Sequence, residues 1–198
     1  MEAVAQQKVA LRNRARARLA ALTATDVRAK SAAIWERLSV LPEFAGATRL
    51  LVYVSTGAEV DTHGLIRQLL ALGREVWVPW FDPNERKYVA AVLHDFDAEL
   101  APGKFGILEP RSREAQRPVA GLQPDVALVP GLAFDETGNR LGRGLGHYDS
   151  LLQQARGGRI ALAYDFQVLS GIPVESHDAR VDFIVTETRM IRIEGNLP

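Results

Sequence analysis

Hydrophobic residues at helical spacing open the chain. In residues 1–40 they include Leu11, Leu19 and Leu22, whose successive spacings of eight and three positions place them on one face of a helix. Thr25 or Asp26 is placed to cap a second helix, which we expect to continue through residue 38. The pattern therefore predicts two helices at the N-terminus.

The pattern changes at residue 49 to short apolar runs. RLLVYVS (49–55) is nearly continuous, as in a strand buried on both faces. DTHGLIRQLLALG (61–73) follows and predicts a helix capped by Asp61 and ended by Gly73, and EVWVPW (75–80) predicts a second strand. This order is a βαβ unit, which builds a parallel sheet with helices on both faces.

The same theme continues in the second half of the chain. We expect a helix over residues 148–156 and only loops and hairpins, around the weak strand KYVAAVL, over residues 81–124. Further strand candidates are DVALVP (125–130), RIALAY (159–164), DFIVTE (182–187) and MIRIEG (190–195). With no internal repeat and no long linker, we expect one α/β domain spanning residues 1–198.

Composition narrows the classes of protein. The 24 Lys and Arg residues balance 24 Asp and Glu residues, which argues against a broad electrostatic grip on nucleic acid or membrane. The chain has no cysteine, which excludes disulfides, thiolate catalysis and Cys-ligated metals. No apolar run approaches the roughly 20 residues that span a bilayer, and no secretory signal is evident. We expect a soluble, cytoplasmic protein and a monomer.

Basic residues gather on the first predicted helix: Lys8, Arg12, Arg14, Arg16 and Arg18. A solvated helix face is the simpler interpretation of these side chains. RNA binding is the weaker alternative, because the net charge is zero and aromatic residues are not interleaved.

The stretch RLGRGLGHYD (140–149) carries the strongest chemical signal. It lies between a predicted strand and a predicted helix, where glycine N–H groups and the helix N-terminus favour a phosphate. Arg140 and Arg143 could donate to phosphate oxygens or to a carboxylate, and Asp149 suits magnesium (Mg²⁺), with Asp182 as a second carboxylate. The alternatives are a surface turn, a helix cap at Asp149 and a strand start at Asp182. The spacing matches neither a Walker loop nor a dinucleotide fingerprint.

The longer run PGLAFDETGNRLGRGLGHYD (130–149) resembles the 5-formyltetrahydrofolate cyclo-ligase family, also called 5,10-methenyltetrahydrofolate synthetase. Its pattern is P-G-x-A-F-D-x-x-G-x-R-L-G-x-G-x-G-Y-Y-D, from which this chain differs at His147. KVALR (8–12), YVSTGAEVDT (53–62), KFGILEP (104–110) and IPVESHDARVD (172–182) resemble other family segments in the same order. The resemblance covers nearly the whole chain and implies a three-layer, Rossmann-like and CoA-transferase-like sandwich with a mostly parallel sheet and N-terminal helices.

The resemblance also implies an activity and its residues. The activity is the ATP- and Mg²⁺-dependent closure of 5-formyltetrahydrofolate to 5,10-methenyltetrahydrofolate, with release of ADP and phosphate. Catalytic roles fall to Arg140, Arg143 and Tyr148, and the magnesium site to Asp149 and Asp182. The expected ATP contacts are Lys8, Arg12, Arg140, Gly142, Arg143, Gly144, Leu145, Gly146, His147 and Tyr148. The expected folate contacts are Val54, Glu59, Arg143, Gly144, Leu145, Gly146 and His147.

Two other hypotheses remain open from the sequence. One is a non-catalytic module of the same fold that holds nucleotide or folate. The other is a different ATP-dependent small-molecule ligase, which would share the phosphate-handling residues and differ around Val54 and Glu59.

Overall fold

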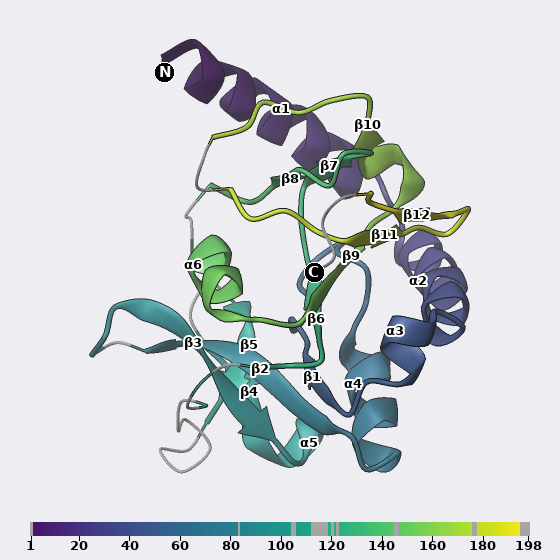
Figure 1. Cartoon of the computed structure of the whole chain (residues 1–198), viewed down its shortest axis with the longest axis vertical. Helices are drawn as coiled ribbons and strands as arrows, with labels where there is room; N and C mark the ends of the chain where they lie inside the picture. The colour runs from purple at the N-terminus through teal and green to yellow at the C-terminus, as the bar shows by residue number, and fades with distance from the viewer. Residues whose placement is uncertain are drawn as a thin grey trace.

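A seven-stranded sheet forms the centre of the structure, a computed structural model (Figure 1). The structure describes residues 2–82, 84–103, 106–111, 119, 121, 123–144, 147–175 and 178–194. In spatial order the strands are β12 (Met190–Arg192), β11 (Phe183–Val185), β9 (Gly158–Leu162), β6 (Val126–Val129), β1 (Arg49–Leu51), β2 (Glu75–Asp82) and β3 (Lys87–Leu93). The inner five strands are parallel, and the two edge strands β3 and β12 are antiparallel to their neighbours.

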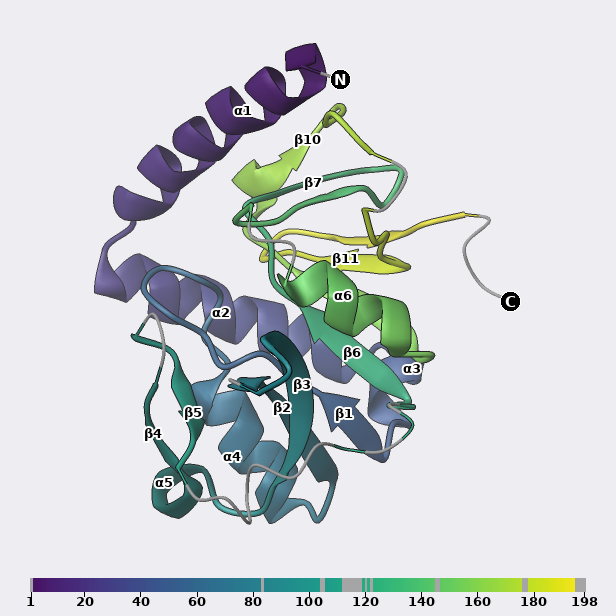
Figure 2. The same cartoon turned by 90° about the vertical axis from the view of Figure 1, so that its left-hand side faces the viewer.

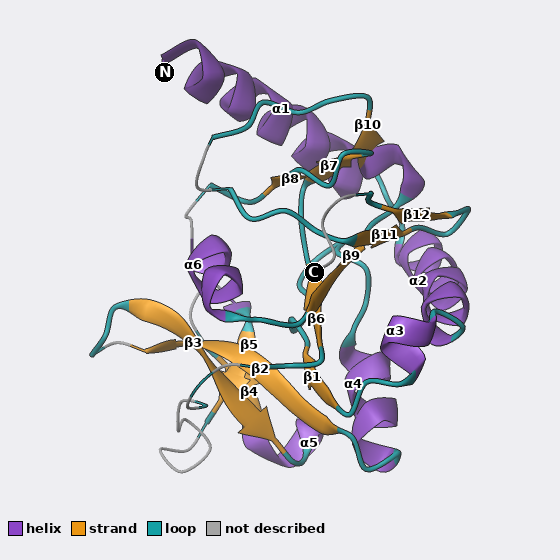
Figure 3. Ribbon diagram, viewed as in Figure 1, coloured by secondary structure: helices purple, strands orange, loops and turns teal. Residues whose placement is uncertain are grey.

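Helices cover both faces of this sheet (Figure 3). The helices α2 (Ala24–Ser39), α3 (Pro42–Ala45) and α4 (His63–Ala71) pack on one face, and α6 (His147–Gln154) packs on the other. Side chains alternate along β1, because Leu50 joins the cluster under α2 and α4 while Leu51 joins the cluster under α6. The predicted βαβ unit is confirmed, since β1, α4 and β2 follow in order and β1 pairs in parallel with β2.

The long helix α1 (Glu2–Ala20) packs against a second, small sheet (Figure 2). That sheet has the order β10 (Val168–Leu169), β7 (Ala133–Asp135) and β8 (Arg140–Leu141). Leu11 of α1 packs with Ala133, Leu141 and Ile172. The helix therefore rests on the strand that leads into the glycine-rich stretch.

The remaining elements lie near β2 and β3, or after β9. They are α5 (Phe96–Glu99), the hairpin of β4 (Leu100–Pro102) with β5 (Leu108–Pro110), and the 3₁₀ turn η2 (Asp165–Gln167). The segment KYVAAVL, expected as a weak strand, forms all of β3 and pairs with β2 over seven residues. In the ranges that the structure covers, no helix combines the length and apolar character needed to cross a membrane.

Two predicted helix caps move by one to three residues. The cap of α2 is Thr23, whose hydroxyl accepts from Asp26 N at 3.1 Å while the Asp26 carboxylate accepts from Thr23 N at 2.9 Å. The cap position of α4 is Thr62, although the predicted Asp61 carboxylate accepts from His63 N at 3.0 Å. Gly73 ends α4 as expected, with a φ of +72°.

Asp125, just before β6, fastens the start of β1. Its carboxylate accepts from Thr48 N, Arg49 N and the Arg49 guanidinium, each at 2.9 Å. The Arg49 backbone N–H first, and then the Thr48 hydroxyl, hold the pKa of Asp125 well below its usual value. Because the pKa is lower in the folded than in the unfolded state, this stabilisation is present above about pH 4 and is lost as the pH falls further.

Asp125→Ala is therefore expected to lower the free energy of unfolding at pH 7 by about 1–2 kcal/mol, after allowance for solvent screening. The difference from the unaltered protein should shrink below about pH 4. Urea unfolding at pH 7 and at pH 3 measures both values. Asp97→Ala, which removes the exposed partner of Arg67, is the control and should cost much less. An equal loss for Asp125→Ala at both pH values would contradict the prediction.

Candidate functional site

A cleft of about 680 Å³ lies beyond the carboxyl ends of β1 and β6. The chain leaves β1 through α4 toward β2 and leaves β6 through α6 toward β9, so the sheet grows in opposite directions from this pair. Such a switch point is where open α/β sheets bind ligands. The volume lies within the range of small-molecule sites, about 300–1,000 Å³.

Two loops and the end of α1 line the cleft. The apolar part of the lining includes Leu19, Tyr53, Val54, Pro79, Tyr88, Ile107 and Leu132. The charged part consists of Arg16, Glu59, Arg140, Arg143 and Asp149. An apolar slot with a few converging charges is the usual form of a site for a ring-containing ligand that carries charged groups.

The loop after β1 presents Glu59 in a fixed position. The backbone N–H of Thr56 donates to Glu59 Oε2 at 2.9 Å, and the hydroxyl of Tyr164 donates to the Glu59 carbonyl at 3.1 Å. Burial raises the pKa of Tyr164 to about 12, so this hydroxyl stays protonated and remains a donor at neutral pH. Val54 in the same loop is buried and lines the cleft. The structure thus brings both predicted folate contacts of this loop to one wall.

The glycine-rich loop is held from behind by α1. Arg12 Nε donates to the Gly142 carbonyl, and Arg16 Nη2 donates to the Arg143 carbonyl, both at 3.1 Å. Gly144 has a φ of +101°, and a Cβ there would lie 3.2 Å from the Arg12 guanidinium carbon. A side chain at Gly144 would therefore strain the backbone and crowd α1.

Arg16 also lines the cleft, although from the sequence it was named only among the basic residues of the first helix. Its spacing of four residues from Arg12 could have indicated a site role, because that spacing places both guanidinium groups on one side of α1. Two other predictions for this loop, Leu145 and Gly146, lie outside the described residues, as does the side chain of His147. His147 itself begins α6.

Arg140 faces inward rather than into open solvent. Its side chain is only 3% exposed; Nη1 donates to the Pro130 carbonyl at 3.0 Å, and Nη2 donates to Asp149. Both ends of the guanidinium are thus occupied by the protein. This side chain holds the Asp149 carboxylate in place, which fits the carboxylate alternative for its forked donors, and its phosphate contact stays a prediction.

Tyr148 contributes its ring, not its hydroxyl, to the cleft. The hydroxyl donates to the Leu128 carbonyl at 2.9 Å, and burial raises the pKa of Tyr148 well above its usual value. A neutral phenol bound to the backbone is a poor proton donor or acceptor for chemistry at neutral pH. The hydroxyl of Tyr148 is thus bound to the backbone at the wall of the cleft, and the catalytic role expected for this residue stays a prediction.

An ion pair joins the two loops across the cleft. Arg143 Nη2 donates to Glu59 Oε1 at 2.7 Å and to Thr56 Oγ1 at 3.0 Å. The Arg143 side chain is 54% exposed, whereas that of Glu59 is 16% exposed. The structure thus joins Arg143 and Glu59, two of the predicted substrate contacts, in one ion pair.

Lys8 connects α1 to the late segment of the chain. Its Nζ donates to Glu175 at 2.7 Å and to Asp178 at 2.6 Å. Burial alone would lower the pKa of Lys8, but the hydrogen bonds with Asp178 and Glu175 outweigh it and raise the pKa. Lys8 lies one turn of α1 before Arg12, so it stands next to the glycine-rich loop without lining the cleft.

Asp182 does not meet Asp149, and the expectation of a shared cavity is wrong. Asp182 lies just before β11 and accepts from Arg159 N at 2.7 Å, beside the beginning of β9. Parallel strands begin at the edge of the sheet opposite to the cleft, which is where Asp182 lies. The carboxylates of this segment that reach α1 are those of Glu175 and Asp178.

The fit of the site to Mg²⁺ depends on Asp149. Among the described residues, no group of three or more His, Asp or Glu side chains could hold a metal by itself. Mg²⁺ is commonly held by one or two carboxylates together with substrate phosphates and water, so Asp149 at the cleft wall fits that mode. Asp182 does not fit it.

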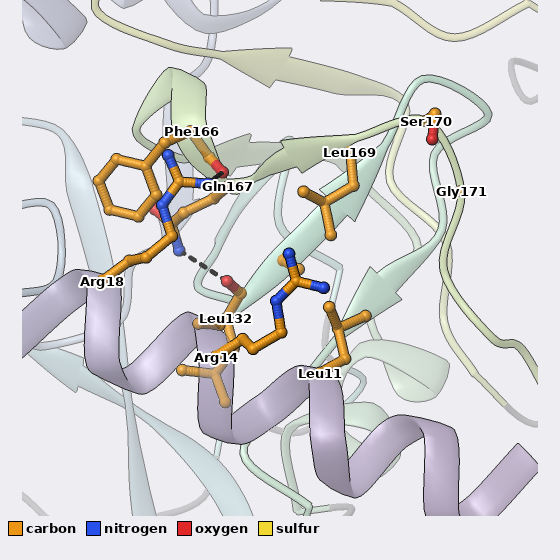
Figure 4. A pocket seen from close by; sticks show the side chains of 11 residues that line it. Leu11, Arg14, Arg18, Leu132, Phe166, Gln167, Leu169, Ser170 and Gly171 are labelled. Atoms are coloured by element: carbon orange, nitrogen blue, oxygen red, sulfur yellow. Dashed lines mark hydrogen bonds between the residues drawn. The ribbon is translucent and has the colours of Figure 1, made fainter.

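A second cavity, of about 290 Å³, lies between α1 and the small sheet (Figure 4). Arg18 lies 4.6 Å above the ring centre of Phe166 and donates to its carbonyl at 3.2 Å, while Gln167 donates to the Leu132 carbonyl. No predicted site residue lines this cavity. Its contacts dock α1 on the body of the protein.

The fold and the cleft define an α/β protein with a candidate small-molecule site at the switch point of its sheet. Comparison with known proteins gives the family. The model of the 5-formyltetrahydrofolate cyclo-ligase family matches residues 4–187, and the chain therefore belongs to this family of enzymes.

Individual relatives agree with this assignment. The chain is 30% identical to 5-formyltetrahydrofolate cyclo-ligase of Mus musculus over 191 residues, covering 91% of this chain and 93% of the relative. It is 31% identical to that of Escherichia coli K12 over 158 residues, covering 78% and 86%. The solved structure of Aquifex aeolicus 5,10-methenyltetrahydrofolate synthetase superposes with a TM-score of 0.84 at 32% identity, covering 96% of this chain and 95% of the other.

Proposed function

We propose that the protein closes 5-formyltetrahydrofolate to 5,10-methenyltetrahydrofolate and converts ATP to ADP and phosphate in the process. The observation that carries this proposal is the single cleft in which Val54 and Glu59 face the glycine-rich loop and Asp149. One wall suits a ring with N–H donors, and the other suits phosphate.

The folate would occupy the wall built by the loop after β1. Tyr53, Val54 and Pro79 offer an apolar slot to the bicyclic ring, and Glu59 offers a fixed acceptor to its N–H groups. A charged acceptor that is already held by Thr56 N loses little freedom on binding, which favours one orientation of the ring.

The nucleotide phosphates would lie against Gly142, Arg143 and Gly144. Glycines allow the backbone to approach phosphate oxygens closely, and the N-terminus of α6 adds partial positive charge. Arg12 stands behind this loop as further positive charge, whereas the charge of Lys8 is already balanced by Glu175 and Asp178. We place the γ-phosphate beside Asp149, where bound Mg²⁺ would neutralise negative charge on the phosphate oxygens.

The chemistry needs no protein nucleophile. The formyl oxygen attacks the γ-phosphorus and the bond to the β-phosphate oxygen breaks, which gives an N5 iminium phosphate and ADP. N10 of the same substrate then attacks the formyl carbon and loses its proton, and phosphate leaves with the formyl oxygen. The protein contributes by holding both substrates in line and by stabilising charge on the transferring group.

The test is direct. Purified protein supplied with MgATP and 5-formyltetrahydrofolate should develop the near-ultraviolet absorbance of the methenyl product, with one ADP formed for each ring closed. Omission of ATP should leave the absorbance flat. An unchanged absorbance with folded protein and verified substrates would refute the proposal.

A further inference from the structure

The Arg143–Glu59 ion pair occupies the acceptor that the folate would need. Glu59 Oε2 is held by Thr56 N at 2.9 Å, which leaves Oε1 as the oxygen that faces the cleft. Arg143 Nη2 donates a hydrogen bond to that oxygen at 2.7 Å. A ligand that presents a forked N–H edge to Oε1 therefore competes with Arg143 for that oxygen.

The two partners differ in their freedom to move. Glu59 is mostly buried, and its carbonyl and one carboxylate oxygen are fixed by Tyr164 and Thr56. Arg143 is more than half exposed and lies between Gly142 and Gly144, the second of which has a φ of +101°. Displacement thus moves Arg143, on the loop assigned to phosphate, and leaves Glu59 in place.

Arg143 also resembles the group that would replace it. A guanidinium is a planar carbon with N–H donors arranged in a fork, which suits a carboxylate. The pyrimidine edge of a reduced pterin has the same arrangement, with a ring N–H beside an exocyclic amino group on one carbon. The chain therefore supplies its own substitute for the donor edge of the folate.

We infer that Arg143 is a latch between the two substrate sites: it occupies Glu59 in the free enzyme, and folate binding releases it toward the nucleotide phosphates. This inference rests on the proposed function. Its consequence is positive coupling, in which each substrate tightens the binding of the other by the same factor. Because the pair is partly exposed, we expect a factor of about two to five.

Calorimetry with 5-formyltetrahydrofolate and a β,γ-imido analogue of ATP measures this factor. In the unaltered protein the Kd of each ligand should fall about two- to fivefold when the other is saturating. In Arg143→Ala the folate should bind about two- to fivefold more tightly on its own, and the coupling should disappear. In Glu59→Gln the analogue alone should bind as tightly as it does to the unaltered protein with folate present.

Arg67→Gln is the matched control. Arg67 is about as exposed as Arg143 and forms an ion pair with Asp97 away from the cleft, so its loss should leave the coupling unchanged. Weaker folate binding in Arg143→Ala would make Arg143 a direct folate contact and overturn the latch. Binding of both ligands without coupling would also overturn it while leaving the proposed function intact. Failure of the unaltered protein to bind either ligand would reject the proposed function and the latch together.

Discussion

Asp149→Asn is expected to lower turnover by about 100- to 1,000-fold, a loss typical of removing a group that stabilises charge in the transition state. The carboxylate lines the cleft on the side where we propose that the nucleotide phosphates bind, and it is the group that we assign to the cation. Asparagine keeps the shape and one acceptor oxygen but loses the charge. The rate of methenyl formation at saturating substrates, measured over a range of Mg²⁺ concentrations, gives the size of the loss.

The same substitution should also lower stability. Asp149 is the counter-charge of Arg140, whose side chain is buried, so the variant leaves a guanidinium with only neutral acceptors. We expect a cost of about 1–3 kcal/mol, which at about 2–4 °C per kcal/mol lowers Tm by several degrees. Asp97→Asn, in the exposed pair with Arg67, is the control and should retain rate and Tm. Full turnover of Asp149→Asn at limiting Mg²⁺ would show that Asp149 does not serve the cation.

Arg140→Lys should lower turnover by about 100-fold, which is the scale of loss when a reacting group is misplaced by about 1 Å. The guanidinium bridges the Pro130 carbonyl and the Asp149 carboxylate, and a single ammonium group cannot reproduce that fork. Asp149 would then lose its orientation. The Mg²⁺ concentration for half-maximal rate should rise, whereas the KM for 5-formyltetrahydrofolate should change little, because the loop that carries Glu59 is untouched.

Arg28→Lys is the control for that experiment. Arg28 is exposed and donates only to the nearby Thr25 hydroxyl at 3.2 Å within the described residues, so its exchange should alter neither constant. A rise in the KM for the folate with an unchanged response to Mg²⁺ would place Arg140 against the folate instead of behind Asp149.

Much of the sheet could be predicted because its signals are local. RLLVYVS and EVWVPW are apolar runs of strand length around an amphipathic helix, and they form β1 and β2 as expected. The small sheet escaped prediction because its strands β8 and β10 have two residues each, too few to show a period. The cap of α2 was placed two or three residues late, at Thr25 or Asp26, because Thr23 and Asp26 act as a pair.

The sequence predicted which residues belong to the candidate site, but not which of them contact one another. The motif pointed to Arg143 and Glu59 separately; their contact joins positions 84 apart, for which a single sequence has no signal. The error at Asp182 was avoidable on topological grounds. Ligands bind beyond the carboxyl ends of parallel strands, whereas Asp182 comes just before the beginning of β11 and so lies at the opposite edge of the sheet.

The docking of α1 has a consequence for the order in which the enzyme is assembled during synthesis. Its arginines hold a loop 127 to 130 positions away, and Lys8 holds carboxylates 167 and 170 positions away. The helix therefore leaves the ribosome before any of the groups that fasten it. The nascent chain consequently cannot complete these contacts, or the candidate site beside them, until Asp178 has emerged.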